Sequence, residues 1–376
     1  MRVASRTAVA EFHDVAVESG CVFEQLTIAY ETYGRLNADR SNAVLIEHAL
    51  TGDPHVSSGV EHPAAADAPR SFAPGWWEDV VGPGRAIDTN EFFVVCANAI
   101  GGCNGSTGPT SPSPDGLTYG SRFPSVSIRD MAAAEVLLTD RLGIQAWHAV
   151  VGGSMGGARA LELSLLAPER VRRAAILAAP AFSDADQIAW AHTQIQAIEL
   201  DPDFCGGDYA ELGRFPRQGL GLARKIAHLT YRADAELNAR FANTRQAQWP
   251  QLRHRPRPAS AGDDYYAIES YLDHQARKLV DRFDAQSYRI LTAALRDHDV
   301  RRGRSTDLQQ ALSAARAQFQ VLSVSSDRLY PPAQVAELTA ALPGTVDAHV
   351  IDSWAGHDGF LTEGAQVTPH LRRFLS

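Results

Sequence analysis

The chain has 376 residues, of which 45% are hydrophobic and 21% charged, and its formal net charge is −9. This apolar content is enough to bury a large core, which excludes a wholly disordered chain. The acidic balance opposes binding to the phosphate backbone, which needs a basic surplus, so we expect no nucleic-acid partner.

Short apolar runs bounded by Gly, Pro, Asn or Asp recur along the chain and predict buried strands. They cover residues 43–46, 92–97, 149–151, 174–179, 319–324 and 348–351. Runs this short and this continuous are typical of a parallel sheet that is buried on both faces. Helical patterns lie between several of them, at residues 128–142 and 158–166. The alternation predicts an α/β fold with a doubly wound, mostly parallel sheet.

Between residues 184 and 304 the pattern changes to long, charged, mainly helical segments such as residues 265–280. A Pro-rich break occurs at residues 250–258, and no convincing strand interrupts the helical pattern. We interpret this stretch as a helical lid inserted into the α/β core. The expected domains are therefore residues 1–183 as the first part of the core, 184–304 as the lid and 305–376 as the second part of the core.

A serine lies between an apolar run and a helical pattern, in the segment VVGGSMGG at residues 150–157. This is a GxSxG motif centred on Ser154, in which a strand turns sharply into a helix and only small residues fit two positions away. The turn holds the hydroxyl clear of the backbone, and the N–H of Met155 at the helix N-terminus can stabilise an oxyanion. The alternative is a glycine-rich turn without chemistry. The matching context on both sides favours a catalytic nucleophile.

A serine is a good nucleophile near pH 7 only when an imidazole accepts its proton and an acid orients that imidazole. Asp327 follows the apolar run at residues 319–324, and His357 follows the next run. This order resembles the α/β-hydrolase fold, in which the acid comes after the serine and before the histidine. We therefore predict a triad of Ser154, Asp327 and His357. Asp184 is the rival acid, and a turn or cap is the structural alternative for Asp327.

The loop after an early strand supplies the second oxyanion donor in this fold. The segment HALTGD at residues 48–53 follows the apolar run at residues 43–46. The N–H of Leu50 is therefore the expected donor. A plain turn at Thr51 and Gly52 is the alternative.

Three nearby histidines, His48, His55 and His62, invite a metal interpretation, but they lack the short fixed spacing of zinc ligands. We therefore expect no metal. The four cysteines have no CxxC spacing, and no secretory leader points to an oxidising compartment. No run of about 18 apolar residues occurs either. We expect free thiols, no membrane partner and a cytoplasmic location.

Ten segments together resemble the homoserine O-acetyltransferase family, which has the α/β-hydrolase fold. They cover nearly the whole chain in the right order, which is far more specific than GxSxG alone. They are HALTGD (48–53), GWWEDVVGPG (75–84), GGCNGSTGP (101–109), GSRFP (120–124), SIRD (127–130), GGSMGGARALE (152–162), ARKIAHLTYR (223–232), RFDAQSY (282–288), SDRLYPP (326–332) and GHDGFL (356–361).

The resemblance implies transfer of an acetyl group from acetyl-CoA to the side-chain hydroxyl of L-homoserine, a step that leads to methionine. It implies a ping-pong route through an acetyl-serine enzyme, with Ser154, Asp327 and His357 as the triad. Acetyl-CoA is then a co-substrate, and no cofactor is expected.

The resemblance also implies contacts to the amino-acid substrate. Arg224 and Tyr231 from ARKIAHLTYR, and Asp358 from GHDGFL, are the residues that it assigns. A guanidinium can bind the α-carboxylate in bidentate fashion, and a carboxylate beside the histidine can bind the α-ammonium group. For Arg224 the alternative is a solvated helical charge, and for Asp358 a turn residue. The resemblance further implies a homodimer formed through the helical lid, while residues 54–73 are longer than in some relatives.

Other functions remain open on the residues alone. Succinyl-CoA could replace acetyl-CoA as the donor, and L-serine could replace homoserine as the acceptor. An esterase or thioesterase would use water as the acceptor, and buried polar groups matched to an amino acid, above all Arg224, would argue against that. A hydrolase fold recruited as a receptor or scaffold usually loses a triad member, whereas this chain has a candidate for all three.

Overall fold

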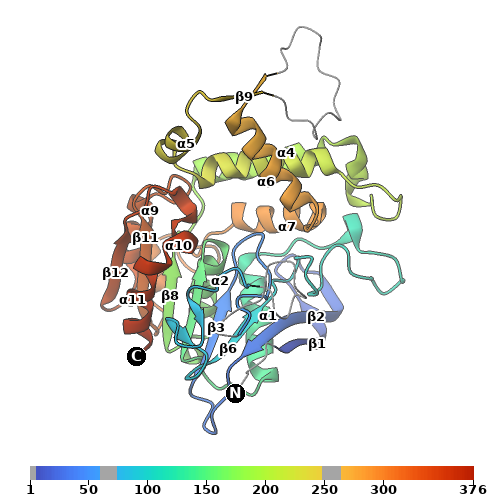
Figure 1. The fold of residues 1–376 in the computed structure, drawn as a ribbon. Coiled ribbons are helices and arrows are strands. Elements are labelled where there is room, and N and C mark those ends of the chain that lie inside the picture. The colour runs from blue at the N-terminus through green and yellow to red at the C-terminus, as the bar shows by residue number, and fades with distance from the viewer. Residues whose placement is uncertain (1–5, 60–73, 248–263) are drawn as a thin grey trace.

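An eight-stranded sheet lies at the centre of the computed structural model, which describes residues 6–59, 74–247 and 264–376. The strand order is β1-β2-β6-β3-β7-β8-β11-β12. Six neighbouring strands are parallel: β6 (Phe93–Ala97), β3 (Ala43–Glu47), β7 (Ala149–Gly153), β8 (Arg173–Leu177), β11 (Gln318–Val324) and β12 (Val346–Ile351). The two strands at the other edge, β1 (Arg6–Ala16) and β2 (Val22–Tyr33), are antiparallel (Figure 1).

The predicted fold class, a mostly parallel and doubly wound sheet, is confirmed, and each of the six apolar runs forms a strand. The β1–β2 pair is absent from the predicted elements. Buried and exposed positions are mixed along β2 because one face of this antiparallel pair meets solvent. Its sequence therefore has no continuous apolar run by which a buried strand could be detected.

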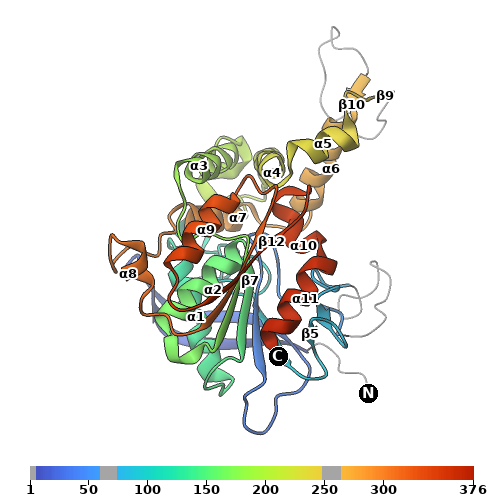
Figure 2. The same ribbon diagram turned by 90° about the vertical axis from the view of Figure 1, so that its left-hand side faces the viewer.

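Helices cover both faces of the sheet, as Figure 2 shows. On one face lie α1 (Ile128–Arg141), α2 (Met155–Leu166) and α9 (Pro332–Ala341), and on the other lies α11 (Gly364–Leu375). Successive side chains of β7 pack alternately against the helices on the two faces of the sheet. Val150 packs in one apolar cluster with residues of α1 and α2, and Val151 packs in the other with Val367 and Leu371 of α11. This alternation is the two-residue period of a strand that is buried on both sides.

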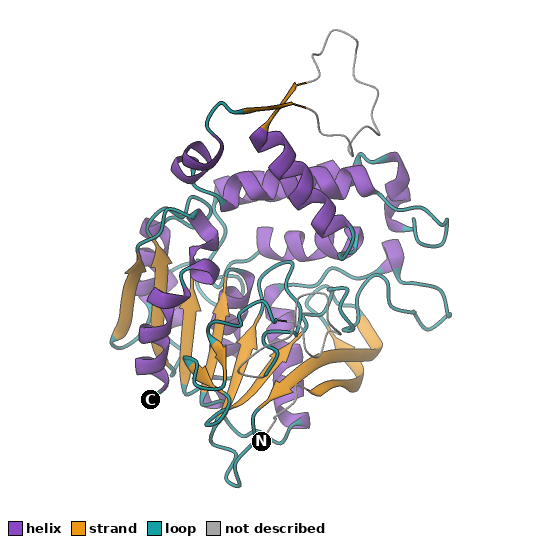
Figure 3. Cartoon of the chain, viewed as in Figure 1, coloured by secondary structure: helices purple, strands orange, loops and turns teal. Residues whose placement is uncertain are grey.

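A helical region lies over one end of the sheet (Figure 3). It contains α3 (Ala185–Glu199), α4 (Arg217–Tyr231), α5 (Asp234–Phe241), α6 (Ala267–Val280) and α7 (Ala285–Arg296). The expectation that no strand interrupts it is wrong, because β9 (Arg245–Ala247) and β10 (Asp264–Tyr266) pair as antiparallel strands. Strands of three residues are too short to show a period. Residues 250–258 lie outside the described ranges, and the domain boundaries at 184 and 304 remain a prediction.

The remaining elements are short. They are β4 (Val81–Gly82), β5 (Ile87–Asp88), α8 (Leu308–Leu312) and α10 (Gly359–Thr362), with 3-10 helices η2 (Gly120–Arg122), η3 (Pro168–Arg170), η4 (Pro202–Gly207) and η5 (Gly356–Asp358). Across the described ranges, no helix is both long enough and apolar enough to cross a membrane. All four cysteines, which lie within these ranges, are free thiols.

Candidate active site

Ser154 forms a strained turn between β7 and α2. Its φ of 57° lies in the left-handed region, which is uncommon for any residue with a side chain. The turn is tight because a Cβ on Gly156 would lie 1.9 Å from the carbonyl oxygen of Glu47, so only glycine fits there. The N–H of Ser154 donates to the carbonyl of Leu177 on β8 at 2.9 Å. These contacts fix the serine at the carboxyl end of the parallel strands, where α/β sheets carry their sites.

The two predicted oxyanion donors lie on segments that pack against each other. Met155 is the first residue of α2, and among the described residues no side chain caps this end, so its N–H has no partner within the helix. Leu50 follows β3, whose last residue, Glu47, packs against Gly156. The loop of Leu50 therefore lies beside the helix N-terminus, as a two-donor oxyanion site requires.

His48 holds the loop of Leu50. One ring nitrogen, Nδ1, lies 2.8 Å from the carbonyl oxygen of Ala49, and Nε2 lies 3.1 Å from the N–H of Ala99. Burial, together with the charge of Arg159, lowers the pKa of His48 to about 3. The ring is therefore neutral, donating from Nδ1 and accepting at Nε2.

The other histidines of the metal interpretation are placed as follows. Nδ1 of His55 lies 2.9 Å from Oε2 of Glu31, and His62 lies outside the described residues. No group of three or more His, Cys, Asp or Glu side chains that could hold a metal ion occurs in the described part of the chain.

Asp327 and His357 are paired. Nδ1 of His357 lies 2.7 Å from Oδ2 of Asp327, and both side chains are buried. The second oxygen of Asp327 accepts from the N–H groups of Leu329 and Tyr330 at 2.8 and 2.9 Å, which fixes the carboxylate. The histidine therefore donates from Nδ1 and keeps a lone pair on Nε2, the arrangement of a general base.

The pKa of His357 lies above its ordinary value. Burial by itself lowers this pKa, but the charge of Asp327 and the hydrogen bond to it raise it, and the charge of Asp358 adds to the increase. The carboxylates outweigh burial because they stabilise the protonated ring directly.

Phe360 connects the histidine to the serine turn. Its ring centroid lies 5.5 Å from that of His357, and a Cβ on Gly153 would lie 2.2 Å from the same phenyl ring. Gly153 immediately precedes Ser154. The structure thus brings all three predicted triad residues to the same end of the sheet, where they follow the carboxyl ends of β7, β11 and β12.

Asp184, the rival acid, is engaged elsewhere. Its side chain accepts from the N–H groups of Asp186 and Gln187 and caps α3. Asp184 is exposed, whereas Asp327 is buried against the histidine. The geometry therefore favours Asp327 as the acid.

Arg224 and Tyr231 lie on one face of α4, seven residues apart, and this face is directed at His357. The Tyr231 ring lies 5.8 Å from the His357 ring, and Cζ of Arg224 lies 5.7 Å from the centroid of Tyr231. Nε of Arg224 is buried without a hydrogen-bond partner, and the guanidinium forms no ion pair with any described residue. A half-buried guanidinium without an ion-pair partner, next to Tyr231, can bind a carboxylate.

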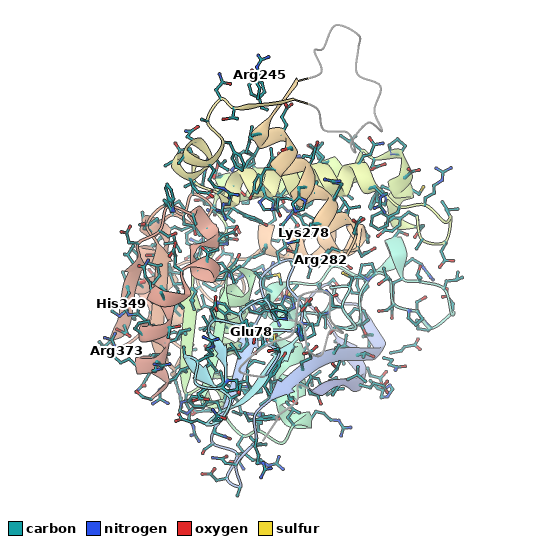
Figure 4. The ribbon with its side chains drawn as sticks, in the orientation of Figure 1. Glu78, Arg245, Lys278, Arg282, His349 and Arg373 are labelled. Carbon is teal, nitrogen blue, oxygen red and sulfur yellow. The ribbon has the colours of Figure 1, made fainter. Side chains whose placement is uncertain are left out.

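Two arginines near the site were missed by the sequence interpretation. Arg232 pairs with Asp358, with Nη1 3.2 Å from Oδ2. Nη1 of Arg282 donates to the carbonyl of Thr51, the residue after Leu50, at 2.8 Å. Figure 4 places Arg282 at the end of α6 that faces the core. Both belong to motifs of the family resemblance, but neither has a local pattern that indicates a role.

A buried ion network lies under the serine turn. Arg159 on α2 is fully buried, with its Nε 3.4 Å from Oε2 of Glu47, and it also pairs with Glu135 on α1. Burial raises the pKa of Glu47 well above its usual range, and the negative charge of the neighbouring Glu135 raises it further. One arginine thus faces two carboxyl groups that are too close together for both to be ionised easily.

A serine on a tight strand-to-helix turn, with a buried Asp–His pair at the neighbouring strand ends, defines an α/β hydrolase, and the chain matches the family model "alpha/beta hydrolase fold" over residues 42–364. A curated protein of Thermobifida fusca (strain YX), "Homoserine O-acetyltransferase", is 50% identical over 362 residues, which are 96% of this chain and 91% of that protein. The chain belongs to the homoserine O-acetyltransferase family.

Solved structures agree with this assignment. The crystal structure of homoserine O-acetyltransferase from Bacillus anthracis matches with a TM-score of 0.87 and 26% identity, over 99% of this chain and 98% of that one. The crystal structure of esterase E22 matches with a TM-score of 0.85 and 25% identity, over 99% of this chain and 100% of that one. The same fold with a similar chain length therefore occurs in proteins named for acyl transfer and for hydrolysis.

Proposed function

We propose that the chain transfers an acetyl group from acetyl-CoA to the hydroxyl of L-homoserine through an acetyl-Ser154 intermediate, a step of methionine biosynthesis. Membership of the family supports the activity. The observation that supports an amino acid, rather than water, as the acceptor is the unpaired Arg224 next to Tyr231, whose ring in turn lies beside that of His357.

In the first half-reaction, Ser154 attacks the thioester carbonyl of acetyl-CoA while Nε2 of His357 accepts its proton. Asp327 keeps the imidazole in the required tautomer and stabilises the imidazolium that forms. The N–H groups of Leu50 and Met155 bind the oxyanion, and the tetrahedral intermediate collapses. Coenzyme A leaves as the thiol after receiving the proton from His357.

In the second half-reaction, homoserine binds with its α-carboxylate on Arg224 and its α-ammonium group on Asp358, and Tyr231 packs beside it. His357 accepts the proton of the side-chain hydroxyl, and the resulting nucleophile attacks acetyl-Ser154. The same oxyanion donors serve again, and Ser154 leaves with the proton from His357. The cycle uses two substrates and no resident cofactor.

Hydrolysis is the competing outcome, because water can attack the same acetyl-serine. The similarity to esterase E22 gives this alternative a structural basis. Arg224 distinguishes the two, since a hydrolase has no use for a half-buried guanidinium without an ion-pair partner at the acceptor position.

The decisive experiment incubates the protein with acetyl-CoA or succinyl-CoA, each with homoserine, serine or no acceptor, and identifies products by mass spectrometry. We expect O-acetylhomoserine from acetyl-CoA and homoserine, and slow acetate release without an acceptor. Equal acetate release with and without homoserine would instead identify a thioesterase. Preferred succinyl transfer, or preferred transfer to serine, would keep the mechanism and change the substrates.

We also propose that the protein is a cytoplasmic homodimer formed through the helical region. On α4, Leu222 and Leu229 are 51% and 41% exposed, and Ile226 lies between them on the same stripe. Exposed apolar residues one and two turns apart on a helix are typical of a helix-packing surface. A second copy of the chain is the proposed partner. Sedimentation analysis of Leu222→Glu tests it, because a buried charge in this surface should yield monomers.

A further inference from the structure

Arg232 connects the C-terminal end of α4 to the loop that carries His357. Its Nη1 lies 3.2 Å from Oδ2 of Asp358, and its Nε donates to Oε2 of Glu236 at 2.8 Å. The side chains of Arg232 and Glu236 are 13% and 4% exposed. The guanidinium is therefore anchored by one buried carboxylate while it holds a second, the one directly after the candidate base.

Backbone packing fixes the same junction. Gly356 has a φ of 75°, and a Cβ there would lie 2.4 Å from the carbonyl oxygen of Tyr231 and 2.7 Å from the nitrogen of Ala233. Only glycine allows this approach. The turn at residues 356–358 is thus seated on the backbone on either side of Arg232, so that the arginine and Asp358 keep a fixed relationship.

We propose that Arg232 is a positioning residue, which holds Asp358 in the orientation that binds the α-ammonium group of the acceptor amino acid. The inference rests on the function proposed above, because it assumes an amino-acid acceptor. The Asp358 side chain is 24% exposed, so without a partner it could turn toward solvent. Arg232 prevents this because the guanidinium fork binds Glu236 and Asp358 at once, which the single point charge of a lysine cannot do with the same geometry.

Arg232 also balances charge beside the base. Burial lowers the pKa of His357 and Asp327 raises it, and Asp358 raises it further. Removing the positive charge of Arg232 leaves Asp358 less neutralised, so the protonated imidazole becomes more favourable and the pKa of His357 rises again. A purely structural role for Arg232 would not produce this shift.

The test compares Arg232→Gln and Arg232→Lys with Arg240→Gln. Arg240 is a matched control because its Nη1 donates to Oε1 of the same Glu236 at 2.7 Å, whereas within the described residues it has no hydrogen bond or ion pair with Asp358. We expect Arg232→Gln to raise the KM for homoserine about tenfold or more, from the loss of a charged hydrogen bond. The burst of coenzyme A from acetyl-CoA alone should persist at high pH, with its pH midpoint shifted upward. Arg232→Lys should raise the KM but keep the midpoint, and Arg240→Gln should change neither.

A double variant separates positioning from folding. If Arg232 acts through Asp358, adding Arg232→Gln to Asp358→Asn leaves the KM for homoserine as it is in Asp358→Asn, whereas a further, multiplicative increase overturns the inference. The inference about Arg232 is also overturned if Arg232→Gln folds and has the wild-type KM for homoserine and the wild-type pH midpoint of the burst. In that case, acetylation of homoserine by the wild type still supports the proposed function. If Arg232→Gln does not fold, the KM of Arg232→Lys decides. A wild type that releases no coenzyme A from acetyl-CoA overturns the proposed function itself.

Discussion

Nδ1 of His357 lies 2.7 Å from Oδ2 of Asp327, although the two residues are 30 positions apart and come from loops after different strands. Their side chains are 4% and 0% exposed. In such a dry environment the carboxylate interacts strongly with the imidazolium, and water does not compete for the hydrogen bond. The pair therefore determines both the tautomer of the base and the pH at which it can work.

The first prediction concerns the nucleophile. Ser154→Ala should abolish acetyl transfer, because no other hydroxyl occupies the turn, and it should leave the fold intact. Incubation of the wild type with acetyl-CoA should add one acetyl group on Ser154, which intact-mass and peptide mass spectrometry can locate. Retained transfer in Ser154→Ala, or an acetyl group on another residue, would disprove the assignment.

The second prediction concerns pH. The acylation step needs neutral His357, and its pKa is raised in the fold, so the rate should increase with pH with a midpoint above the 6.5 of a free imidazole. The contribution of His357 to the stability of the fold changes with pH in the opposite direction to the rate. Because the pKa of His357 is raised in the fold, this contribution is fully present below the unfolded-state pKa and is lost as the pH rises through the folded-state pKa. Pre-steady-state release of coenzyme A between pH 5 and 9 measures the midpoint, and a value below 6.5 would contradict the structure.

The third prediction distinguishes the two candidate acids. Asp327→Asn should reduce the rate by roughly a thousandfold to ten-thousandfold, because the amide favours the wrong tautomer of His357. Asp184→Asn is the matched control, since asparagine caps a helix about as well as aspartate does. Steady-state kinetics and a thermal melt on both variants suffice. A larger loss in Asp184→Asn would mean that the acid is misassigned.

The fourth prediction concerns Arg224. Arg224→Ala should reduce transfer to homoserine by roughly 30-fold to several thousand-fold, which corresponds to about 2–5 kcal/mol for a desolvated charged contact. The burst of coenzyme A should remain, because the donor half-reaction does not use the acceptor site. Arg224→Lys should recover little, since lysine lacks the planar fork.

Lys225→Ala is the control for Arg224→Ala, because its charge is already paired with Asp273. It should leave both half-reactions unchanged. Stopped-flow release of coenzyme A with and without homoserine measures both halves. A burst that slows as much as the turnover would assign Arg224 to coenzyme A or to the fold.

The fifth prediction concerns stability. Arg159→Leu leaves Glu47 and Glu135 buried without their cation, so unfolding should become easier by roughly 3–5 kcal/mol. Arg316→Leu is the control, because Arg316 pairs with Glu169 on the surface and such a pair contributes at most about 1 kcal/mol. Urea denaturation at pH 7 compares the two. Equal losses would show that the buried network does not stabilise the fold.

The sequence predicts the part of the fold that local patterns encode. The six parallel strands are continuous apolar runs, and the turn at Ser154 has its own motif. The β1–β2 pair was missed because its alternating exposure resembles ordinary polar chain, and β9 and β10 because they are too short.

The candidate site was predictable where strand ends meet, because parallel topology brings those ends together. The ion pair between Arg232 and Asp358, which are 126 residues apart, depends on how α4 packs against the core. No periodic pattern in the local sequence indicates that packing. The role of Asp184 as the cap of α3 was not predicted, since aspartate caps and catalytic aspartates look alike in sequence.

The seating of Gly356 against the backbone at Tyr231 and Ala233 has a consequence for how such an enzyme could evolve. The loop of His357 packs against the backbone at the C-terminal end of α4, so the helical region forms a wall of the candidate site and not only a cover over it. Shortening or exchanging that helix would disturb His357 together with Arg224 and Tyr231. New acceptors should therefore arise by substitutions on the inward face of α4, while its length and its exit point stay the same.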